Sequence, residues 1–360
     1  MNQNNHDSRR NFIKNSSLGL GTILAGMNVP LLSNDHHVAK NAKLPRQICV
    51  ATMDIKTYMP DWPDKTREAR VNRMIKRMDE LTGLRPDIIC LPELFDTMWV
   101  EEPIKVSEVA EDEKVPGPVT SKIGAFAKKN NCYVICPIYT KKNGHYYNSS
   151  VLIDRKGAIA GVYHKTHPVK SEMQVENDVG VAAGAIDQPV FETDFGKVGM
   201  QICYDAYWSD GWDNLHQKGA DIVFFPSAMP AGRLLNYYAS KYEYYVVSST
   251  GNDARVIDKS GNDLDCTSDF FRIAWATINL NKVNVDIWPP ARIGDIYRKY
   301  GDRIGVRVWT NTDVTTIESL DPGLDIRNVL KEFELPVFSE YIKNETGIHE
   351  KYRQETSKMK

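Results

Sequence analysis

A cysteine ends an apolar, strand-like run near the middle of the chain, where segment 198–208 reads VGMQICYDAYW. Cys203 stands where a strand is expected to turn sharply into a helix. A thiol at such a turn faces the free N–H groups of the following helical turn, which lower its pKa and hold a developing oxyanion. The pattern predicts a nucleophile, although a lone cysteine at a strand end is also typical of a small core residue.

A glutamate and a lysine occupy two further segments of this kind. Segment 86–95 reads PDIICLPELF and places Glu93 after a buried strand, where burial raises a carboxyl pKa toward the range of a general base. Segment 161–168 reads GVYHKTHP and places Lys165 among aromatic and proline residues. Taken singly, Glu93 is also typical of a helix start and Lys165 of a solvated surface. Because they occur together with Cys203, a catalytic role becomes the better interpretation of both residues.

In this order and in these contexts, Glu93, Lys165 and Cys203 resemble the nitrilase superfamily of carbon–nitrogen hydrolases. The resemblance runs from about Arg46 to about Ile278 and more faintly beyond. It implies an α/β fold, a four-layer αββα sandwich, and a Glu-Lys-Cys catalytic triad made of the three residues. It also implies a homodimer or higher homo-oligomer.

The resemblance further implies a mechanism that needs no cofactor and no metal. Cys203 attacks the carbon of an amide, a carbamoyl group or a nitrile, and Glu93 carries the proton to the departing nitrogen. Lys165 and the backbone N–H of Tyr204 stabilise the oxyanion, and water activated by Glu93 cleaves the thioester. Ammonia or an amine is released.

Other site residues are predicted from their positions relative to these motifs. Relatives carry a second, supporting glutamate, for which Glu176 is preferred because Glu-x-x-x-Gly-Val-x-x-Gly matches the spacing, with Glu172 as the alternative. The predicted substrate-binding residues are Tyr204, Trp208 and Ser227.

Two departures from the family pattern leave the subfamily open. Tyr242 stands where many relatives have an asparagine, and segment 206–210 reads AYWSD where many have a Phe-Pro-Glu type of sequence. An amidase or carbamoyl-amide hydrolase is the leading interpretation. A nitrile-hydrolysing nitrilase is the alternative, and the pair Tyr204-Asp205 speaks against it because that branch more often has Trp-Glu.

Two other classes of function fit the same three residues less well. A catalytically silent binding module of the same fold has no need of all three residues of the triad. A cysteine peptidase with His164 or His167 as its base leaves Glu93 and Lys165 unexplained, and neither histidine has an obvious partner in the sequence. The intact triad therefore favours a hydrolase.

Composition limits the partners and the redox chemistry. With 45 basic and 47 acidic residues, a net charge of −2 gives no signature of nucleic-acid binding. A small-molecule substrate is expected instead. The six cysteines do not have the spacing of a disulfide framework, and Cys203 is expected to stay free. Four others in apolar runs are expected to be buried thiols: Cys49, Cys90, Cys132 and Cys136.

The N-terminal region has the pattern of an export signal. Segment 8–14 reads SRRNFIK, which matches the twin-arginine motif, and an apolar stretch follows at 18–27. That stretch is too short and glycine-rich for a stable membrane span. The protein is thus predicted to be periplasmic or secreted. The expected organisation is a signal peptide at 1–30, a linker at 31–45, a hydrolase domain at 46–335 and a C-terminal arm at 336–360.

Alternating strand and helix patterns predict how these residues are positioned. Segment 220–227 repeats the pattern of 86–93, and 256–261 repeats that of 152–157, which predicts two similar halves in one domain. The chain is expected to be irregular beyond Leu280, with a final helix or arm at 329–341. The predicted strands are 47–52, 88–91, 132–136 and 148–153, and the predicted helices are 71–81 and 119–129.

Overall fold

The computed structural model describes residues 47–55, 64–268, 271–286 and 290–358, which belong to one compact unit, Lys43–Lys360. The predicted signal peptide and linker lie outside the described residues. Among the helices that are described, none has the length and apolar character required to cross a bilayer.

The first sheet has seven strands in the described chain, in the order β13-β1-β2-β4-β5-β6, with β3 paired to β4. Its central strands β1, β2 and β4 are parallel, and the outer pairs are antiparallel, apart from the short parallel pair β3 and β4. The strands are β1 (Gln47–Met53), β2 (Ile88–Cys90), β3 (Glu111–Asp112), β4 (Tyr133–Lys142), β5 (His145–Ile153), β6 (Ile159–His164) and β13 (Ile273–Asn279).

The second sheet has six strands in the order β12-β11-β10-β9-β8-β7, and its central strands β8, β9 and β10 are likewise parallel. The predicted repeat is confirmed, because β2 and β9 hold corresponding central places. The turns that follow β5 and β11 match too. The Gly157 N–H donates to Asp154 O at 2.9 Å, and the Gly261 N–H donates to Asp258 O at 2.8 Å. The strands are β7 (Phe191–Glu192), β8 (Lys197–Met200), β9 (Ile222–Pro226), β10 (Tyr245–Ser249), β11 (Arg255–Ile257) and β12 (Asp263–Cys266).

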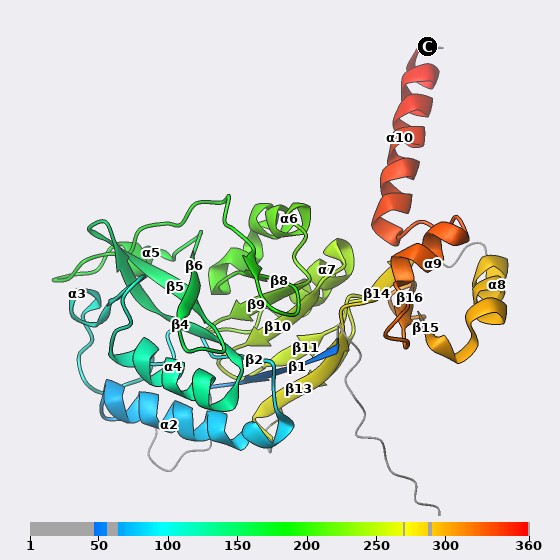
Figure 1. The fold of residues 1–360 in the computed structure, drawn as a ribbon. Coiled ribbons are helices and arrows are strands. Elements are labelled where there is room, and N and C mark those ends of the chain that lie inside the picture. The colour runs from blue at the N-terminus through cyan, green and yellow to red at the C-terminus, as the bar shows by residue number, and fades with distance from the viewer. Residues whose placement is uncertain (1–46, 56–63, 269–270, 287–289, 359–360) are drawn as a thin grey trace, which may run out of the picture. The chain divides into compact units, whose positions relative to one another are not determined.

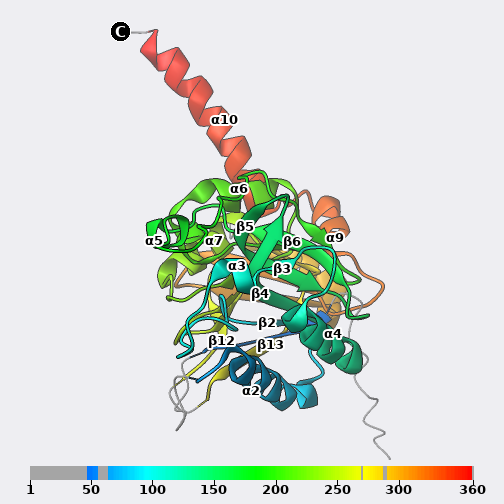
Figure 2. The same cartoon turned by 90° about the vertical axis from the view of Figure 1, so that its left-hand side faces the viewer.

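The two sheets pack face to face between two layers of helices, so the predicted αββα sandwich is confirmed (Figure 1, Figure 2). One apolar cluster joins the sheets, with Ile88 and Tyr163 from the first and Met200 and Phe224 from the second. Helices α2 (Arg67–Glu80) and α4 (Pro118–Asn130) cover the first sheet. Helices α6 (Ser209–Gln217) and α7 (Arg233–Tyr242) cover the second.

Helix α2 shows why these helices form and which face they bury. Thr66 caps its first turn, where the hydroxyl accepts the N–H of Ala69 at 3.1 Å. Val71, Met74 and Met78 recur at helical spacing and are buried against the sheet. Shorter elements connect the layers: η1 (Thr82–Leu84), α3 (Val106–Val109), α5 (Lys170–Met173) and η2 (Cys203–Tyr207).

The described residues beyond Leu280 form helices and strands, so the prediction of an irregular region is wrong for them. It contains a third sheet in the order β14-β16-β15 with its own apolar cluster. Each short strand contributes few apolar residues, and this makes the sequence pattern weak. The elements are β14 (Lys282–Val285), α8 (Pro290–Tyr300), η3 (Gly301–Arg303), β15 (Ile304–Trp309), β16 (Val314–Ser319), α9 (Ile326–Glu332) and α10 (Phe338–Ser357).

The final helix, α10, differs from every other long helix of the described chain, because none of its residues is buried (Figure 1, Figure 2). It projects from the third sheet, and the predicted helix at 329–341 is divided between α9 and α10. Its first turn is held to the sandwich by Glu243, whose carboxylate accepts the N–H and the hydroxyl of Ser339, each at 2.9 Å.

Candidate active site

Three predicted catalytic residues and the predicted substrate-binding residue Ser227 lie where strands end at the same edge of the sandwich. Glu93 follows β2, Cys203 follows β8, and Ser227 follows β9, while Lys165 comes directly after β6. Parallel central strands deliver their carboxyl ends to one edge, and the two sheets face each other there. Segments more than a hundred residues apart are therefore brought together.

Cys203 occupies the predicted sharp turn at the end of its strand. Its φ is +47°, in the left-handed region that non-glycine residues rarely adopt. The turn is held by Asp205, whose carboxylate accepts the N–H of Ile202 at 2.9 Å. A strained residue held by its surroundings is typical of functional sites.

The Cys203 thiol does not have the lowered pKa that its position predicts. Burial and the Glu93 carboxylate raise the pKa to about 11, against the lowering effects of Lys165, the Ser227 hydroxyl and the Ala228 N–H. The prediction of a lowered pKa is wrong because burial of the sulfur and the negative charge of Glu93 both disfavour the thiolate. Near neutral pH the thiol keeps its proton, so its reaction requires a base.

Glu93 and Lys165 form a buried ion pair. Lys165 Nζ lies 2.9 Å from Glu93 Oε1, and the two side chains are only 2% and 1% exposed. Glu93 Oε2 accepts the N–H of Ala228 at 2.7 Å, and that same N–H also reaches the Cys203 thiol. The Ala228 amide thus lies near both the carboxylate and the sulfur, and the Glu93 carboxylate acts on the thiol through its charge.

The second glutamate beside Lys165 is Glu172, so the preference for Glu176 is corrected. Glu172 Oε2 lies 2.8 Å from Lys165 Nζ and also accepts the N–H of Val169 at 2.8 Å. Glu176 is exposed. The physical reason is the short helix α5, which turns Glu172 back onto its own N-terminus. Burial lowers the Lys165 pKa, but the two carboxylates outweigh it and raise the pKa overall.

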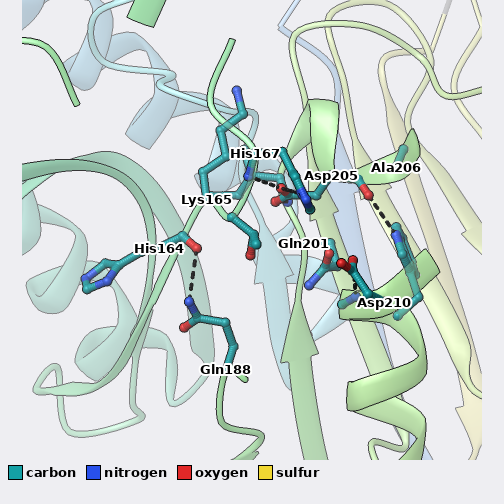
Figure 3. A network of polar contacts seen from close by, with 12 residues as sticks. His164, Lys165, His167, Gln188, Gln201, Asp205, Ala206 and Asp210 are labelled. Atoms are coloured by element: carbon teal, nitrogen blue, oxygen red, sulfur yellow. Dashed lines mark hydrogen bonds and ion pairs between the residues drawn. The ribbon is translucent and has the colours of Figure 1, made fainter. Parts of the chain in front are cut away.

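Two further polar residues of the site were not found from the sequence. Asn148 on β5 donates to both glutamates beside Lys165. Asp205 is fully buried and accepts the Tyr163 hydroxyl at 2.8 Å and the His167 N–H at 2.7 Å. Asp205 therefore joins the cysteine turn to the segment that carries Lys165 (Figure 3). Its place two residues after Cys203 was the available sequence signal.

The histidines next to Lys165 have carboxylate partners, contrary to the sequence prediction. His164 Nε2 lies 2.5 Å from Glu113 Oε1. His167 Nδ1 lies 3.1 Å from Asp205 Oδ1, as Figure 3 shows. The pairing fails to appear in the sequence because Glu113 lies about 50 residues away.

A small pocket opens beside Cys203. Two of the three predicted substrate-binding residues, Tyr204 and Ser227, line it. Trp208 does not; its ring stacks on His167 at a centroid distance of 4.1 Å and lies 5.1 Å from the ring of Tyr204, and its role in substrate binding stays a prediction. The remaining lining residues are uncharged: Ala206, Tyr207, Met229, Pro230 and Ala231.

The other cysteines have the expected environment. Cys49, Cys90, Cys132 and Cys136 are buried, and Cys266 is exposed. Among the described residues, no three His, Cys, Asp or Glu side chains are grouped so as to hold a metal ion. Cys203 is thus the cysteine that combines partial exposure, a cavity and charged neighbours.

Comparison with known proteins agrees with this arrangement. A family model described as carbon-nitrogen hydrolase matches residues 49–271. A nitrilase of Pyrococcus abyssi is 30% identical over 192 residues, which cover 52% of this chain and 69% of that protein. A beta-ureidopropionase of Arabidopsis thaliana is 34% identical over 125 residues, or 32% of this chain, and the chain spans only 29% of its length.

Solved structures share the fold at low sequence identity. The crystal structure of Saccharomyces cerevisiae Nit3, a member of the nitrilase superfamily, has a TM-score of 0.54 at 17% identity. The match covers 71% of this chain and 95% of that one. The likeness extends through the sandwich layers and supports the assignment of fold.

Proposed function

Because the chain belongs to the carbon-nitrogen hydrolase family, whose members act on non-peptide C–N bonds, we propose that it hydrolyses a small amide or carbamoyl compound through a Cys203 thioester. The observation that carries the proposal is the buried cluster at the strand ends, where Lys165 lies 2.9 Å from Glu93 and both residues act on the Cys203 thiol. A carboxylate, an ammonium and a thiol in one site can supply a base, an oxyanion stabiliser and a nucleophile.

The proposed reaction has two halves. Cys203 Sγ attacks the carbonyl carbon, Glu93 takes the thiol proton, and the oxyanion is stabilised by Lys165 and the Tyr204 N–H. The C–N bond then breaks as Glu93 passes the proton to the nitrogen, and ammonia or an amine leaves. Water, deprotonated by Glu93, attacks the thioester and releases the acid and the free thiol.

Ammonia release from amides, ureido acids and nitriles tests the proposal, with purified parent and Cys203→Ala compared. Cys266→Ala is the matched control, since that cysteine is exposed and lies away from the cavity lining. We expect the Cys203 variant to lose release and the control to keep it. Release that survives Cys203→Ala would exclude the cysteine mechanism, and absence of turnover in the parent would favour a silent binding module.

Nitrile hydrolysis is the second candidate, because the Pyrococcus abyssi relative is described as a nitrilase. Activity confined to nitriles in the same panel would favour it over the amidase. Trapping of an acyl group on Cys203 by mass spectrometry is expected with amides.

We also propose that residues 1–30 direct twin-arginine export to the periplasm or the exterior. The support is the segment SRRNFIK followed by a short apolar stretch. The double variant Arg9→Lys/Arg10→Lys should accumulate inside the cell. Normal export of this variant in fractionated cells would contradict the proposal.

A homo-oligomer is proposed as the working form. Helix α10 has 20 residues and none is buried, while Ile342, Ile348 and Tyr352 are exposed on it. An isolated helix with exposed apolar residues gains stability from a packing partner. Light scattering should show a smaller assembly for a variant that ends at Pro336 than for the full chain; equal masses would contradict this role of α10.

A further inference from the structure

The amide of Asn148 connects the charged groups beside the candidate nucleophile. Asn148 lies on β5 opposite Tyr139 of β4 and is 1% exposed. Its Nδ2 donates to Glu93 Oε1 at 2.8 Å and to Glu172 Oε1 at 2.6 Å. Its backbone carbonyl accepts the N–H of Lys165 at 2.8 Å. One residue therefore contacts all three members of the buried charge cluster.

The charges of this cluster do not balance. Two carboxylates, Glu93 and Glu172, face one ammonium, that of Lys165. Like charges in a buried site oppose ionisation of one another, whereas donors to a carboxylate favour its ionised form. The two amide hydrogens of Asn148 supply one donor to each carboxylate. These two hydrogen bonds reduce the repulsion between the carboxylates, which one ammonium does not fully neutralise.

The orientation of the Asn148 amide leaves one of its polar atoms without a hydrogen bond in the described chain, which lowers the stability of the fold. With Nδ2 turned to the glutamates, Asn148 Oδ1 is buried and accepts no hydrogen bond from any residue that the structure describes. Leaving a buried acceptor unsatisfied costs about 1–3 kcal/mol. The two hydrogen bonds that Nδ2 donates to the glutamate carboxylates are the interactions that offset this cost.

The contacts also separate the two oxygens of Glu93. Oε1 accepts from Lys165 and from Asn148, and this leaves Oε2 on the side of the Ala228 N–H. That N–H also lowers the Cys203 pKa. Fixing Oε1 therefore also fixes the direction of Oε2, on the side of Ala228.

We propose that Asn148 is a positioning residue that holds the Glu93 and Glu172 carboxylates in place around Lys165 and fixes the orientation of Glu93 for its role as base. The inference rests on the proposed function, because it assigns to Asn148 the support of the base in that reaction. Asn148 acts through Glu93.

The pH dependence of turnover separates this role from a merely structural one. Loss of the two amide donors makes Glu93 easier to protonate, so the base is lost at a higher pH. The other titratable groups that act on this site are Glu172, Lys165, Cys203 and Tyr139, and burial followed by the two glutamates raises the Tyr139 pKa. Tyr139 and Lys165 titrate on the alkaline side, away from the acid limb that reports Glu93.

The test uses Asn148→Leu, which has similar volume and no donor, and Asn148→Ser, which keeps one donor. Ser150→Ala, two residues along β5, is the matched control, because its buried hydroxyl accepts or donates no hydrogen bond within the described chain. We expect kcat for Asn148→Leu to fall about 10-fold to 100-fold, the scale of general-base catalysis, with KM little changed. Its acid limb should move up by about one pH unit, a tenfold shift in proton affinity.

Asn148→Ser should lie between the parent and Asn148→Leu in both kcat and acid limb, and it serves if the leucine variant does not fold. An acid limb at the parent position in either folded variant would overturn the inference. If Cys203→Ala still turns over, the proposed function itself fails. If Cys203→Ala is inactive while the Asn148 variants keep the parent profile, only the role of Asn148 fails.

Discussion

Two buried lysines in this fold have carboxylate partners but different surroundings. Lys165 lies between Glu93 and Glu172 at the ends of the central strands. Lys282, the first residue of β14, lies 2.5 Å from Asp258 in the turn after β11, and its side chain is 9% exposed. The first lysine lies beside a cysteine and a cavity, and the second joins the C-terminal sheet to the sandwich.

The difference shows what makes a buried ion pair chemically useful. Lys165 faces an excess of negative charge and lowers the pKa of a thiol, so it interacts with a group that changes charge during a reaction. Lys282 balances a single carboxylate, and its backbone carbonyl accepts the Lys259 ammonium at 3.2 Å. The Lys282–Asp258 pair holds the C-terminal sheet on the sandwich. Removal of either partner leaves an uncompensated buried charge.

The largest expected effect comes from Lys165→Met. Loss of the ammonium removes a charged stabiliser of the oxyanion, and we expect kcat/KM for an amide to fall about 10³-fold or more. Lys282→Met is the matched control and should keep most of the activity of each folded molecule. Steady-state ammonia release checks both, and a Lys165 variant within tenfold of the parent would contradict the distinction.

Lys282→Met is expected to act on stability instead. It leaves Asp258 buried without its ammonium, which costs about 3–5 kcal/mol in the free energy of unfolding. Urea unfolding at pH 7 measures the loss. The double variant Lys282→Met/Asp258→Asn should recover much of it, because the amide oxygen still accepts the Ser260 N–H. Without such recovery, the charge would not be the cause.

The reactivity of Cys203 sharpens the comparison without any substrate. Because its thiol pKa is about 11, the thiolate fraction and the rate of iodoacetamide alkylation should rise about tenfold per pH unit from pH 7 toward that value. Lys165 lowers this pKa, so Lys165→Met should slow alkylation about tenfold at pH 8–9. Lys282→Met should leave the rate unchanged. A Cys266→Ser background removes the exposed thiol, and equal rates in both lysine variants would refute the difference.

The smallest expected effect concerns the other attachment of the C-terminal region. Glu243→Gln weakens the hydrogen bonds that the carboxylate accepts from Ser339, which we expect to cost about 1 kcal/mol. Limited trypsin cleavage within α10 should then be about fivefold faster, with kcat/KM unchanged. Glu340→Gln, at an exposed site of the same helix turn, is the control, and equal cleavage of both variants would count against the attachment.

Much of the candidate site could be predicted from the sequence because its signals are local. Glu93, Lys165 and Cys203 each follow a strand pattern within a few residues, and the repeat of 86–93 at 220–227 indicated two similar sheets. The contact between Glu93 and Lys165 confirms that the motifs converge. The prediction of export concerns residues outside the described chain and remains a prediction.

The supporting residues depend on contacts that no local pattern records. Glu172 and Glu176 differ by one helical turn, and only the fold of α5 decides which faces Lys165. Asn148 reaches Glu93 from β5, although β4 separates β5 from β2 in the assembled sheet. The C-terminal sheet also went unrecognised, because its short strands become apolar cores only when paired.

The sequence by itself determined the order of the three functional groups along the chain. A carboxylate comes first, then an ammonium and then a thiol, and each follows its own strand. Alternating apolar patterns and short motifs encode such features within a few residues. The tertiary structure alone decided the raised pKa of the Cys203 thiol, the choice of Glu172, and the partners of Asn148 and Asp205. Burial and charge are properties of the whole packed surroundings, which arise only when distant segments meet.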